Sequence, residues 1–191
     1  KLKRDVIQAY MENKVNQSDF INTTSKLIND YIQYGNCFAT VDFVRKATDY
    51  EDGDRSVNYI GPKVVRISPY DIVFNPTAAE FADSPKIVRS IVTLGEVQRK
   101  VDETMDNAYM ADIFSKMLSN RSTAKGNEVD TSKSDGFVAD GFANITDYYE
   151  SNYVELLTFY GDIYDSESGK FHNNRIITVV DRSYILQNIE N

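Results

Sequence analysis

Hydrophobic and polar residues follow two different periods along this chain, and the local period predicts where helices and strands fall. Residues 4–14 carry apolar side chains at helical spacing, which predicts the end of a helix. A clearer helix is predicted over residues 20–34, whose apolar residues recur on one side. Ser18 or Asp19 is expected to cap its start, and Gly35 is expected to end it, because glycine readily adopts the left-handed conformation.

Residues 34–76 form the block around which the rest of the chain is organised. Residues 37–44 alternate with the period of a strand that has one face on a core, and the lone Cys37 is expected to be buried there. The apolar positions of that face are Cys37, Ala39, Val41 and Phe43. Residues 64–74 predict a second strand, rich in Val and Ile. Ser68–Pro69 interrupts it, and since proline lacks an amide donor we expect a bend or an edge there.

The second half of the chain begins with a third strand, predicted over residues 87–94. Thr93 and Glu96 then fit a capping box, in which the two side chains each satisfy an amide at a helix start. Helical spacing continues to Leu118. Residues 119–147 are rich in Ser, Asn, Lys, Gly and Asp, and we read them as a long flexible loop within the same domain.

Three further strands are predicted near the end of the chain. Residues 153–164 form the first, with Gly161 as a possible bulge, and residues 165–169 make a hairpin turn. Residues 175–180 return, and residues 184–186 form a last short strand. The predicted fold class is therefore α+β: one domain spanning residues 1–191, with a mostly antiparallel sheet and about three flanking helices.

The composition argues against several kinds of binding partner. The net charge is −8 and the isoelectric point is near 4.7, whereas tight binding to nucleic acid needs clustered Lys and Arg. A single cysteine allows no internal disulfide and no cysteine-built zinc site. No apolar stretch approaches the ~20 residues of a membrane span, so no membrane partner is expected. The chain begins without Met and ends abruptly at Asn191, so we expect it to be a piece of a longer protein.

No catalytic, cofactor-binding or metal-binding residue is predicted, and no cofactor is expected. Glycine-rich phosphate loops are missing, and the lone His172, placed just past a hairpin turn, is expected to be solvated. Carboxylates gather in two places, Asp49–Asp54 and the turn that holds Asp162 and Asp165. Neither has EF-hand spacing, and both are typical of solvated loops.

Two features favour contacts with other proteins. The chain has 13 Tyr and 10 Phe but no Trp, and aromatic side chains with a polar tip are favoured at protein interfaces. The segment Thr48–Asp54 carries four carboxylates in seven residues, which suits water, a cation or a basic partner. The candidate interaction residues are Asp49, Glu51, Asp52, Asp54, Tyr148 and Tyr149.

Several segments, in order, resemble the portal (head–tail connector) proteins of tailed bacteriophages, particularly short-tailed and crAss-like phages. The first is YIQYGNCFAT at residues 31–40, followed by VRISPYDIVFNP at residues 65–76. The second is ELLTFYGDIYD at residues 155–165, followed by NRIITVVDR at residues 174–182. A further match is SPKIVRSIVTLGE at residues 84–96. They resemble the wing region of a portal subunit.

This resemblance implies a structural role in the virion. Portals are rings, usually of twelve subunits, at one capsid vertex, through which DNA passes during packaging and ejection without specific binding. The implied partners are other portal subunits and capsid protein, with terminase and tail adaptors bound by the stem and clip, which are not evident here. The implied location is the portal vertex of the virion, and the host cytoplasm during assembly.

The sequence thus predicts a non-enzymatic structural protein, and two other classes remain open. An acid- or metal-dependent hydrolase would need carboxylates from Asp49–Asp54 and Asp162–Asp165 to converge in one pocket. A β-rich binding module would need an exposed sheet edge with a pocket beside it.

Overall fold

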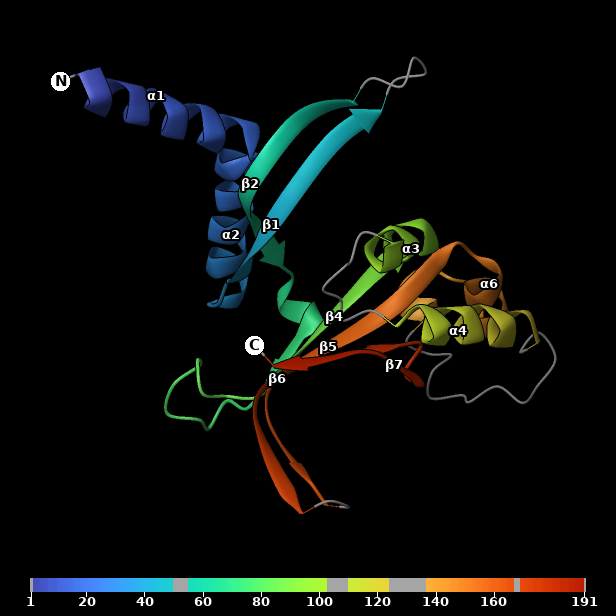
Figure 1. Ribbon diagram of the computed structural model, residues 1–191. Coiled ribbons are helices and arrows are strands. Elements are labelled where there is room, and N and C mark those ends of the chain that lie inside the picture. Colours follow the sequence, from blue (N-terminus) through green and yellow to red (C-terminus); the bar gives the residue numbers. More distant parts are fainter. Residues whose placement is uncertain (1, 50–54, 103–109, 124–136, 167–168, 191) are drawn as a thin grey trace. The chain divides into compact units, whose positions relative to one another are not determined.

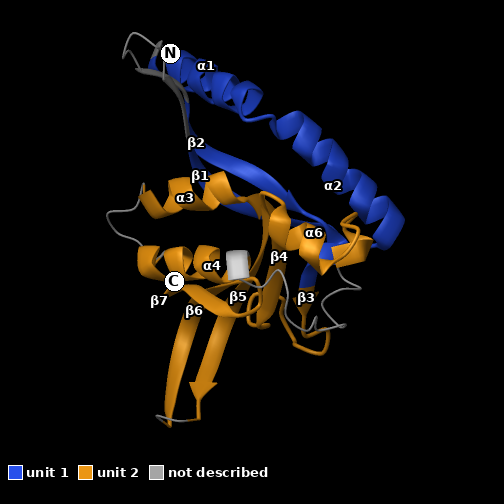
Figure 2. Ribbon diagram, turned by 90° about the vertical axis from the view of Figure 1, so that its right-hand side faces the viewer, with its two compact units in different colours: residues 1–72 blue, residues 73–191 orange. Residues whose placement is uncertain are grey.

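Helices and antiparallel strands share the chain, as the α+β prediction requires (Figure 1). The computed structural model describes residues 2–49, 55–102, 110–123, 137–166 and 169–190. The sequence predicts one domain, whereas contacts divide the chain into unit 1, Lys1–Ile72, and unit 2, Val73–Asn191 (Figure 2). None of the described helices is both long enough and apolar enough to cross a membrane.

Unit 1 consists of two helices and a long hairpin. The helices are α1 (Leu2–Gln17) and α2 (Phe20–Tyr34), and the strands are β1 (Phe38–Asp49) and β2 (Arg55–Ile67). β1 and β2 pair antiparallel as a two-stranded sheet. The strand predicted over residues 64–74 therefore begins earlier, at Arg55.

Only one of the two predicted caps of α2 is confirmed. Gly35 adopts a left-handed φ of 74°, and its amide donates to the Tyr31 carbonyl over 2.9 Å, which confirms the predicted C-cap. The predicted N-cap is wrong. Asp19 is itself left-handed with φ 59° and makes no capping bond, while the Ser18 hydroxyl donates back to the Val15 carbonyl.

The interruption at Ser68–Pro69 is confirmed. A 3-10 turn, η1 (Pro69–Asp71), follows β2, and the Ser68 side chain accepts a hydrogen bond from the Tyr70 amide. The short strand β3 (Ile72–Phe74) comes next.

Unit 2 is built on a five-stranded sheet with the order β3-β4-β5-β6-β7. Its long strands are β4 (Lys86–Thr93), β5 (Tyr153–Asp165), β6 (Lys170–Val180) and β7 (Tyr184–Glu190). The pairs from β4 to β7 are all antiparallel. The predicted bulge is confirmed, since the β5–β6 register shifts just after Gly161, whose φ is 146°.

Helices α3 (Leu94–Asp102) and α4 (Ala111–Thr123) cover one face of this sheet, and α6 (Ile145–Glu150) packs near α4 and β5 (Figure 1). Their shared core consists of Val97, Phe114, Met117, Val154, Leu156, Val180 and Leu186. Each such buried side chain contributes about 1.5–3 kcal/mol to folding. The capping box at the start of α3 is confirmed, because the Glu96 amide donates to Thr93 Oγ1 and the Thr93 amide to Glu96 Oε2.

The predicted loop at residues 119–147 is partly helical. α4 runs on to Thr123, residues 137–139 form a helical turn, and α6 begins at Ile145; residues 124–136 lie outside the described part of the chain. Phe137, Ile145 and Tyr148 form a small buried cluster of their own, which is why the end of this polar stretch is ordered. Its flexibility stays a prediction for the remainder.

Candidate interaction surface

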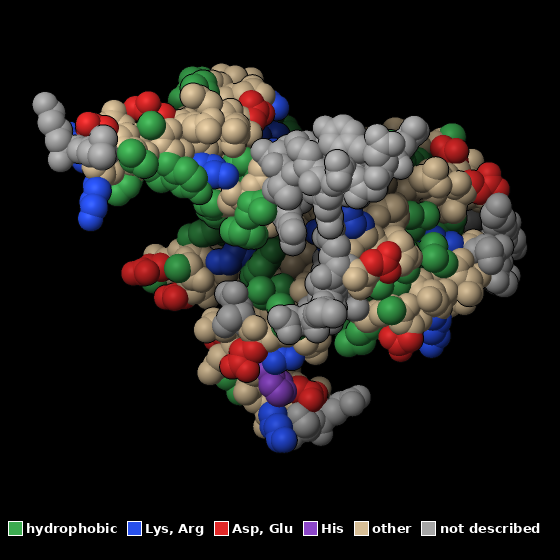
Figure 3. All heavy atoms as spheres, turned by 45° about the horizontal axis from the view of Figure 1, so that its top comes forward, with side chains coloured by type: hydrophobic (Ala, Val, Ile, Leu, Met, Phe, Trp, Pro, Cys, Tyr) green, Lys and Arg blue, Asp and Glu red, His purple; other side chains and the backbone are tan. Residues whose placement is uncertain are grey.

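Unit 1 carries most of its large apolar side chains on its surface. In α1, Val6, Ile7, Tyr10 and Met11 are all more than half exposed. Figure 3 shows hydrophobic side chains gathered along this helix, at the upper left of the view. The buried residues of α2 and of the turn before it are instead polar: Ser18, Thr23 and Asp30. In a domain that folds around its own core, the apolar side chains are buried and the polar ones are exposed; here the distribution is reversed.

α2 meets the hairpin through charge. Asp30, on the face of α2 toward β2, accepts a bidentate pair from Arg66, with Nη2 2.6 Å from Oδ1 and Nε bonded to Oδ2. The hydrogen bonds from Arg66 lower the pKa of Asp30 below its ordinary value. Because the ion pair fixes this face of the helix, the remaining faces are turned away from the hairpin.

One of those remaining faces is an apolar stripe. Ile21, Ile28 and Ile32 are spaced by seven and four residues, which places them on one side of a helix, and they are 54–73% exposed. Ser25 lies among them, but its hydroxyl donates to the Ile21 carbonyl over 3.0 Å and so needs no outside partner. The polar residues Asn22, Lys26, Asn29 and Gln33 lie on a separate face.

The apolar face of β1 is also exposed, contrary to the prediction. Val41 is 65% and Phe43 75% exposed, and Cys37 is exposed as well. The prediction is wrong because strand alternation shows only that one face is apolar. It does not show that the same chain covers that face.

Between α1 and the hairpin lies an apolar groove of about 250 Å³. Met11 and Val15 of α1, Val41 of β1 and Ile60 of β2 line it. Lys14 sits at its side, donating from Nζ to the Ile60 carbonyl over 2.9 Å and lying 4.9 Å from the centre of the Tyr59 ring. No carboxylate among the described residues pairs with this ammonium group, and the groove therefore combines apolar walls with one positive charge.

Unit 2 contains a buried carboxylate with two arginine partners. Glu155 of β5 is fully buried, and Arg89 of β4 and Arg182 both donate to its carboxylate at 2.6–3.0 Å. Burial alone would raise the pKa of Glu155, but the hydrogen bonds from Arg182 and Arg89 outweigh it and hold the pKa below its ordinary value. Arg89 also binds Asp140, whose hydrogen bonds raise the pKa of that guanidinium. The carboxylate thus stays ionised inside the sheet.

A second buried pair lies beside the first. Arg121 of α4 donates to Asp181 from Nε over 2.7 Å and to the Tyr153 carbonyl over 2.8 Å. The Tyr148 hydroxyl donates to Asp181 Oδ1 over 2.5 Å and accepts from the Glu155 amide over 2.6 Å. Tyr148 therefore joins the two ion pairs, and burial raises the pKa of its phenol.

These buried charges were missed by the sequence analysis, although a signal was present. Glu155 stands within the apolar run YVELLTFY and Arg89 within KIVRSIV, and a charge inside a buried strand needs a partner. Arg89 pairs in register with Leu157, two residues beyond Glu155 on β5, so both side chains lie on the same face of the sheet. Each carboxylate at its centre, Glu155 and Asp181, is buried and fully paired, which favours a structural role for this network.

The predicted interaction residues fall into two groups. Glu51, Asp52 and Asp54 lie outside the described residues, as does the side chain of Asp49, whose backbone ends β1. Tyr148 has no exposed surface, since it serves the buried network. Tyr149 is half-buried, so the contact predicted for it stays a prediction.

The carboxylate site of the hydrolase alternative is only half described. Asp162 is exposed and accepts a hydrogen bond from the Asn174 amide over 2.8 Å, while Asp49–Asp54 supplies no described side chain. His172 lies on β6 and is half-buried, not in a solvated turn as predicted. Within the described part of the chain, no three Asp, Glu, His or Cys side chains are placed to hold a metal ion.

Comparison with protein-family models and with curated proteins found no match for this chain.

Proposed function

We propose that this chain is a non-enzymatic structural protein that works by holding other polypeptides, and that it is the wing part of a phage portal subunit. The observation that carries the proposal is the exposed apolar surface of unit 1, on α1, α2 and β1. Large exposed apolar surfaces mark sites of protein interaction. The segments that resemble portal proteins indicate which assembly is meant, the portal ring.

The energetics favour a bound state for unit 1. The stripe residues Ile21, Ile28 and Ile32 and the β1 residues Val41 and Phe43 are each more than half exposed. Fully burying such a side chain contributes ~1.5–3 kcal/mol, so an interface that covers these five gains several kcal/mol before the cost of association. A ring of subunits would supply such cover at every copy.

The proposed partners follow from the assembly. Neighbouring subunits and capsid protein contact this part, DNA passes through the ring without specific binding, and the location is the portal vertex. The net charge of −8 agrees with a wall along which DNA slides, because strong phosphate binding would slow it. Reversing the charges of Asp49, Glu51, Asp52 and Asp54 is expected to lower the yield of particles, and normal yield would remove that role.

Negative-stain imaging of the longer protein that contains this sequence tests the proposal. The expected result is a ring with a central hole. A dispersed monomer at micromolar concentration would contradict it. Incorporation into capsids, followed by gel analysis of purified particles, distinguishes a portal from another ring.

A β-rich binding module is the second candidate, favoured by the groove beside β2. A chain that stays monomeric and binds an extended peptide in that groove, seen as shifts of amide resonances of β2 and α1, would support this candidate over the portal.

A further inference from the structure

The β5–β6 hairpin extends beyond the rest of its sheet. β4 pairs with β5 only up to Tyr160, and β7 pairs with β6 only from Arg175 onward. Between these points the two strands pair, within the described part of the chain, only with each other, and Figure 1 shows the hairpin projecting from the other strands. Such an arm is available to reach another molecule.

The arm carries an aromatic pair with no cover. Tyr164 of β5 and Phe171 of β6 are direct cross-strand partners, 65% and 61% exposed. Neither ring contacts another aromatic ring among the described residues. Exposed aromatic pairs on a rigid hairpin are the usual anchors of protein interfaces, because burying them gains area at little cost in conformational entropy.

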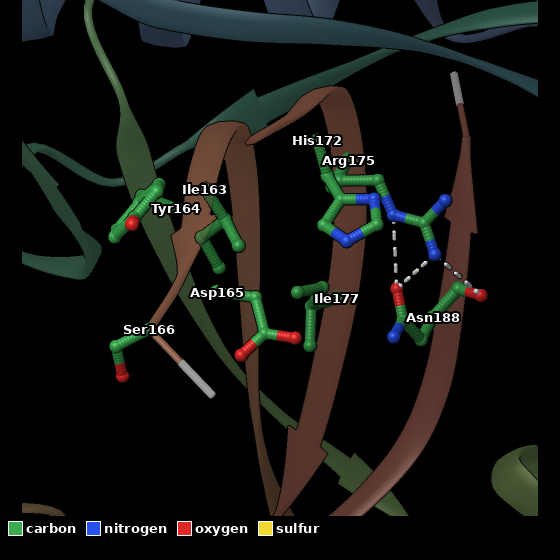
Figure 4. Close-up of a pocket in the computed structure, with 8 residues that line it drawn as sticks. All are labelled: Ile163, Tyr164, Asp165, Ser166, His172, Arg175, Ile177 and Asn188. Carbon is green, nitrogen blue, oxygen red and sulfur yellow. Dashed lines mark hydrogen bonds between the residues drawn. The ribbon is translucent and has the colours of Figure 1, made fainter. Parts of the chain in front are cut away.

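A hydrogen bond braces the root of the arm beside a hollow of about 430 Å³, which His172, Arg175 and Asn188 line together with Tyr164 (Figure 4). Arg175 donates to Asn188 Oδ1 from Nη2 over 2.5 Å. The Tyr164 ring lies apart from these three side chains in the figure. The bracing holds β6 to β7 at the root of the arm, so the aromatic pair is presented by a stiff support.

We propose that this aromatic pair docks into the apolar groove of unit 1 in a second copy of the chain. The groove, at about 250 Å³, is smaller than the ~300–1,000 Å³ of small-molecule sites. A dry apolar cavity of about 150 Å³ accepts a benzene-sized ring, so the groove has room for one ring of the pair, and the other ring would lie over the exposed apolar walls beside it. Its walls, Met11, Val41 and Ile60, are partly exposed and lack another occupant among the described residues.

The charges of the arm and the groove are also complementary. The arm carries the exposed carboxylate of Asp162, whereas the groove holds the ammonium group of Lys14. Lys14 has no carboxylate partner among the described residues, so a carboxylate on the arm complements the charge of the groove. A small ligand could fill the groove but would leave the aromatic pair exposed. A second copy of the chain would fill the groove and cover the aromatic pair in the same contact.

The contact is head-to-tail. The arm belongs to unit 2 and the groove to unit 1, so each copy offers one of each, and the contact repeats from copy to copy. This inference rests on the proposed assembly function and names the surfaces that join neighbouring subunits.

A complementation experiment tests it. One variant removes the arm's anchors, Tyr164→Ser with Phe171→Ser; a second blocks the groove, Met11→Glu with Val41→Glu. All four residues are more than half exposed, so both variants should keep the wild-type circular dichroism and thermal transition. Ile185→Ser, a 51% exposed residue of β7, is the matched control. Masses are measured by analytical ultracentrifugation over a range of concentrations.

The wild type and the control are expected to associate with rising concentration. Each variant alone should bind at least about thirtyfold more weakly, the loss typical of a hot spot. Mixed in equal amounts, the two variants keep one intact contact, and they should form a 1:1 complex of twice the 21.8 kDa chain mass and nothing larger.

Several results would overturn the inference. They are variants that associate like the wild type, a mixture that stays monomeric, or a groove variant that weakens association while the arm variant does not. A wild-type chain that remains monomeric at all concentrations also overturns it. Imaging of the longer protein then decides the proposed function separately, because a ring can form through other surfaces.

Discussion

The hydroxyl of Tyr148 is the link between two buried ion pairs, and removing it is the sharpest test of how unit 2 is held together. Tyr148→Phe deletes one oxygen and keeps the ring, which stacks on Phe137 at 3.9 Å and lies under the Arg121 guanidinium at 4.8 Å. Shape and packing are therefore preserved. Only the two hydrogen bonds, to Asp181 and from the Glu155 amide, are lost.

The expected cost follows from those two bonds. A hydrogen bond to a charged acceptor contributes about 1.5–3 kcal/mol, and a buried amide left without a partner costs about 1–3 kcal/mol. Asp181 keeps its bond to Arg121 Nε, which limits the loss on that side. We therefore expect the free energy of unfolding to fall by about 3 kcal/mol. With a urea dependence of about 2 kcal/mol per molar, the midpoint should fall by about 1.5 M.

Urea unfolding followed by far-ultraviolet circular dichroism measures the midpoint, and amide exchange locates the effect. Exchange at the Glu155 amide should accelerate more than at other residues of β5, because its acceptor is gone. Tyr149→Phe is the matched control. It changes the next residue of α6, whose hydroxyl makes no hydrogen bond to another described residue.

If the Tyr148→Phe midpoint lies within about 0.3 M of the Tyr149→Phe midpoint, the linking role is refuted. An unchanged exchange rate at the Glu155 amide would refute it independently. Either result would mean that water replaces the hydroxyl at little cost.

Three further predictions follow from single positions. Glu155→Gln should destabilise by about 2–4 kcal/mol at pH 7, because it removes the buried carboxylate that pairs with the half-buried guanidinium groups of Arg89 and Arg182. Since the folded-state pKa of Glu155 lies below its ordinary 4.5, the stabilisation is present above pH 4.5 and is lost as pH falls through the folded value. Urea midpoints of wild type and variant should therefore converge in acid, and a constant gap would contradict this. Thr93→Ala should cost about 1 kcal/mol by thermal unfolding while Thr93→Ser costs little, because serine keeps the oxygen that caps the Glu96 amide. Gly161→Ala should cost about 1–3 kcal/mol, because φ is 146° and the new Cβ would lie 3.0 Å from Pro85 Cα; unaltered thermal stability would exclude the close approach.

Local signals in the sequence were sufficient for several details. The Gly35 cap, the Thr93–Glu96 capping box and the Gly161 bulge each depend on residues a few positions apart, and all three are present. The α+β class followed from the same kind of pattern.

What the sequence could not provide was the partner of each surface. Alternation in β1 identified Val41 and Phe43 as one face but could not tell whether the chain itself or another molecule covers it. Glu155 was visible as a charge in an apolar strand, yet its partners Arg89 and Arg182 are 66 and 27 residues away. Pairing at such distances depends on topology, which no local pattern contains.

The span of these pairings also sets an order for folding during synthesis. Unit 1 closes through neighbours in sequence, the hairpin β1–β2 and the helices beside it, so it can form as soon as Ile67 has left the ribosome. The ion pair of Glu155 forms only after Arg182 has been synthesised, and the core of unit 2 is complete only after Leu186 has followed. Unit 1, with its exposed apolar helices, is therefore complete more than a hundred residues of synthesis before the sheet of unit 2, and exposed apolar surface on a partly folded chain favours aggregation.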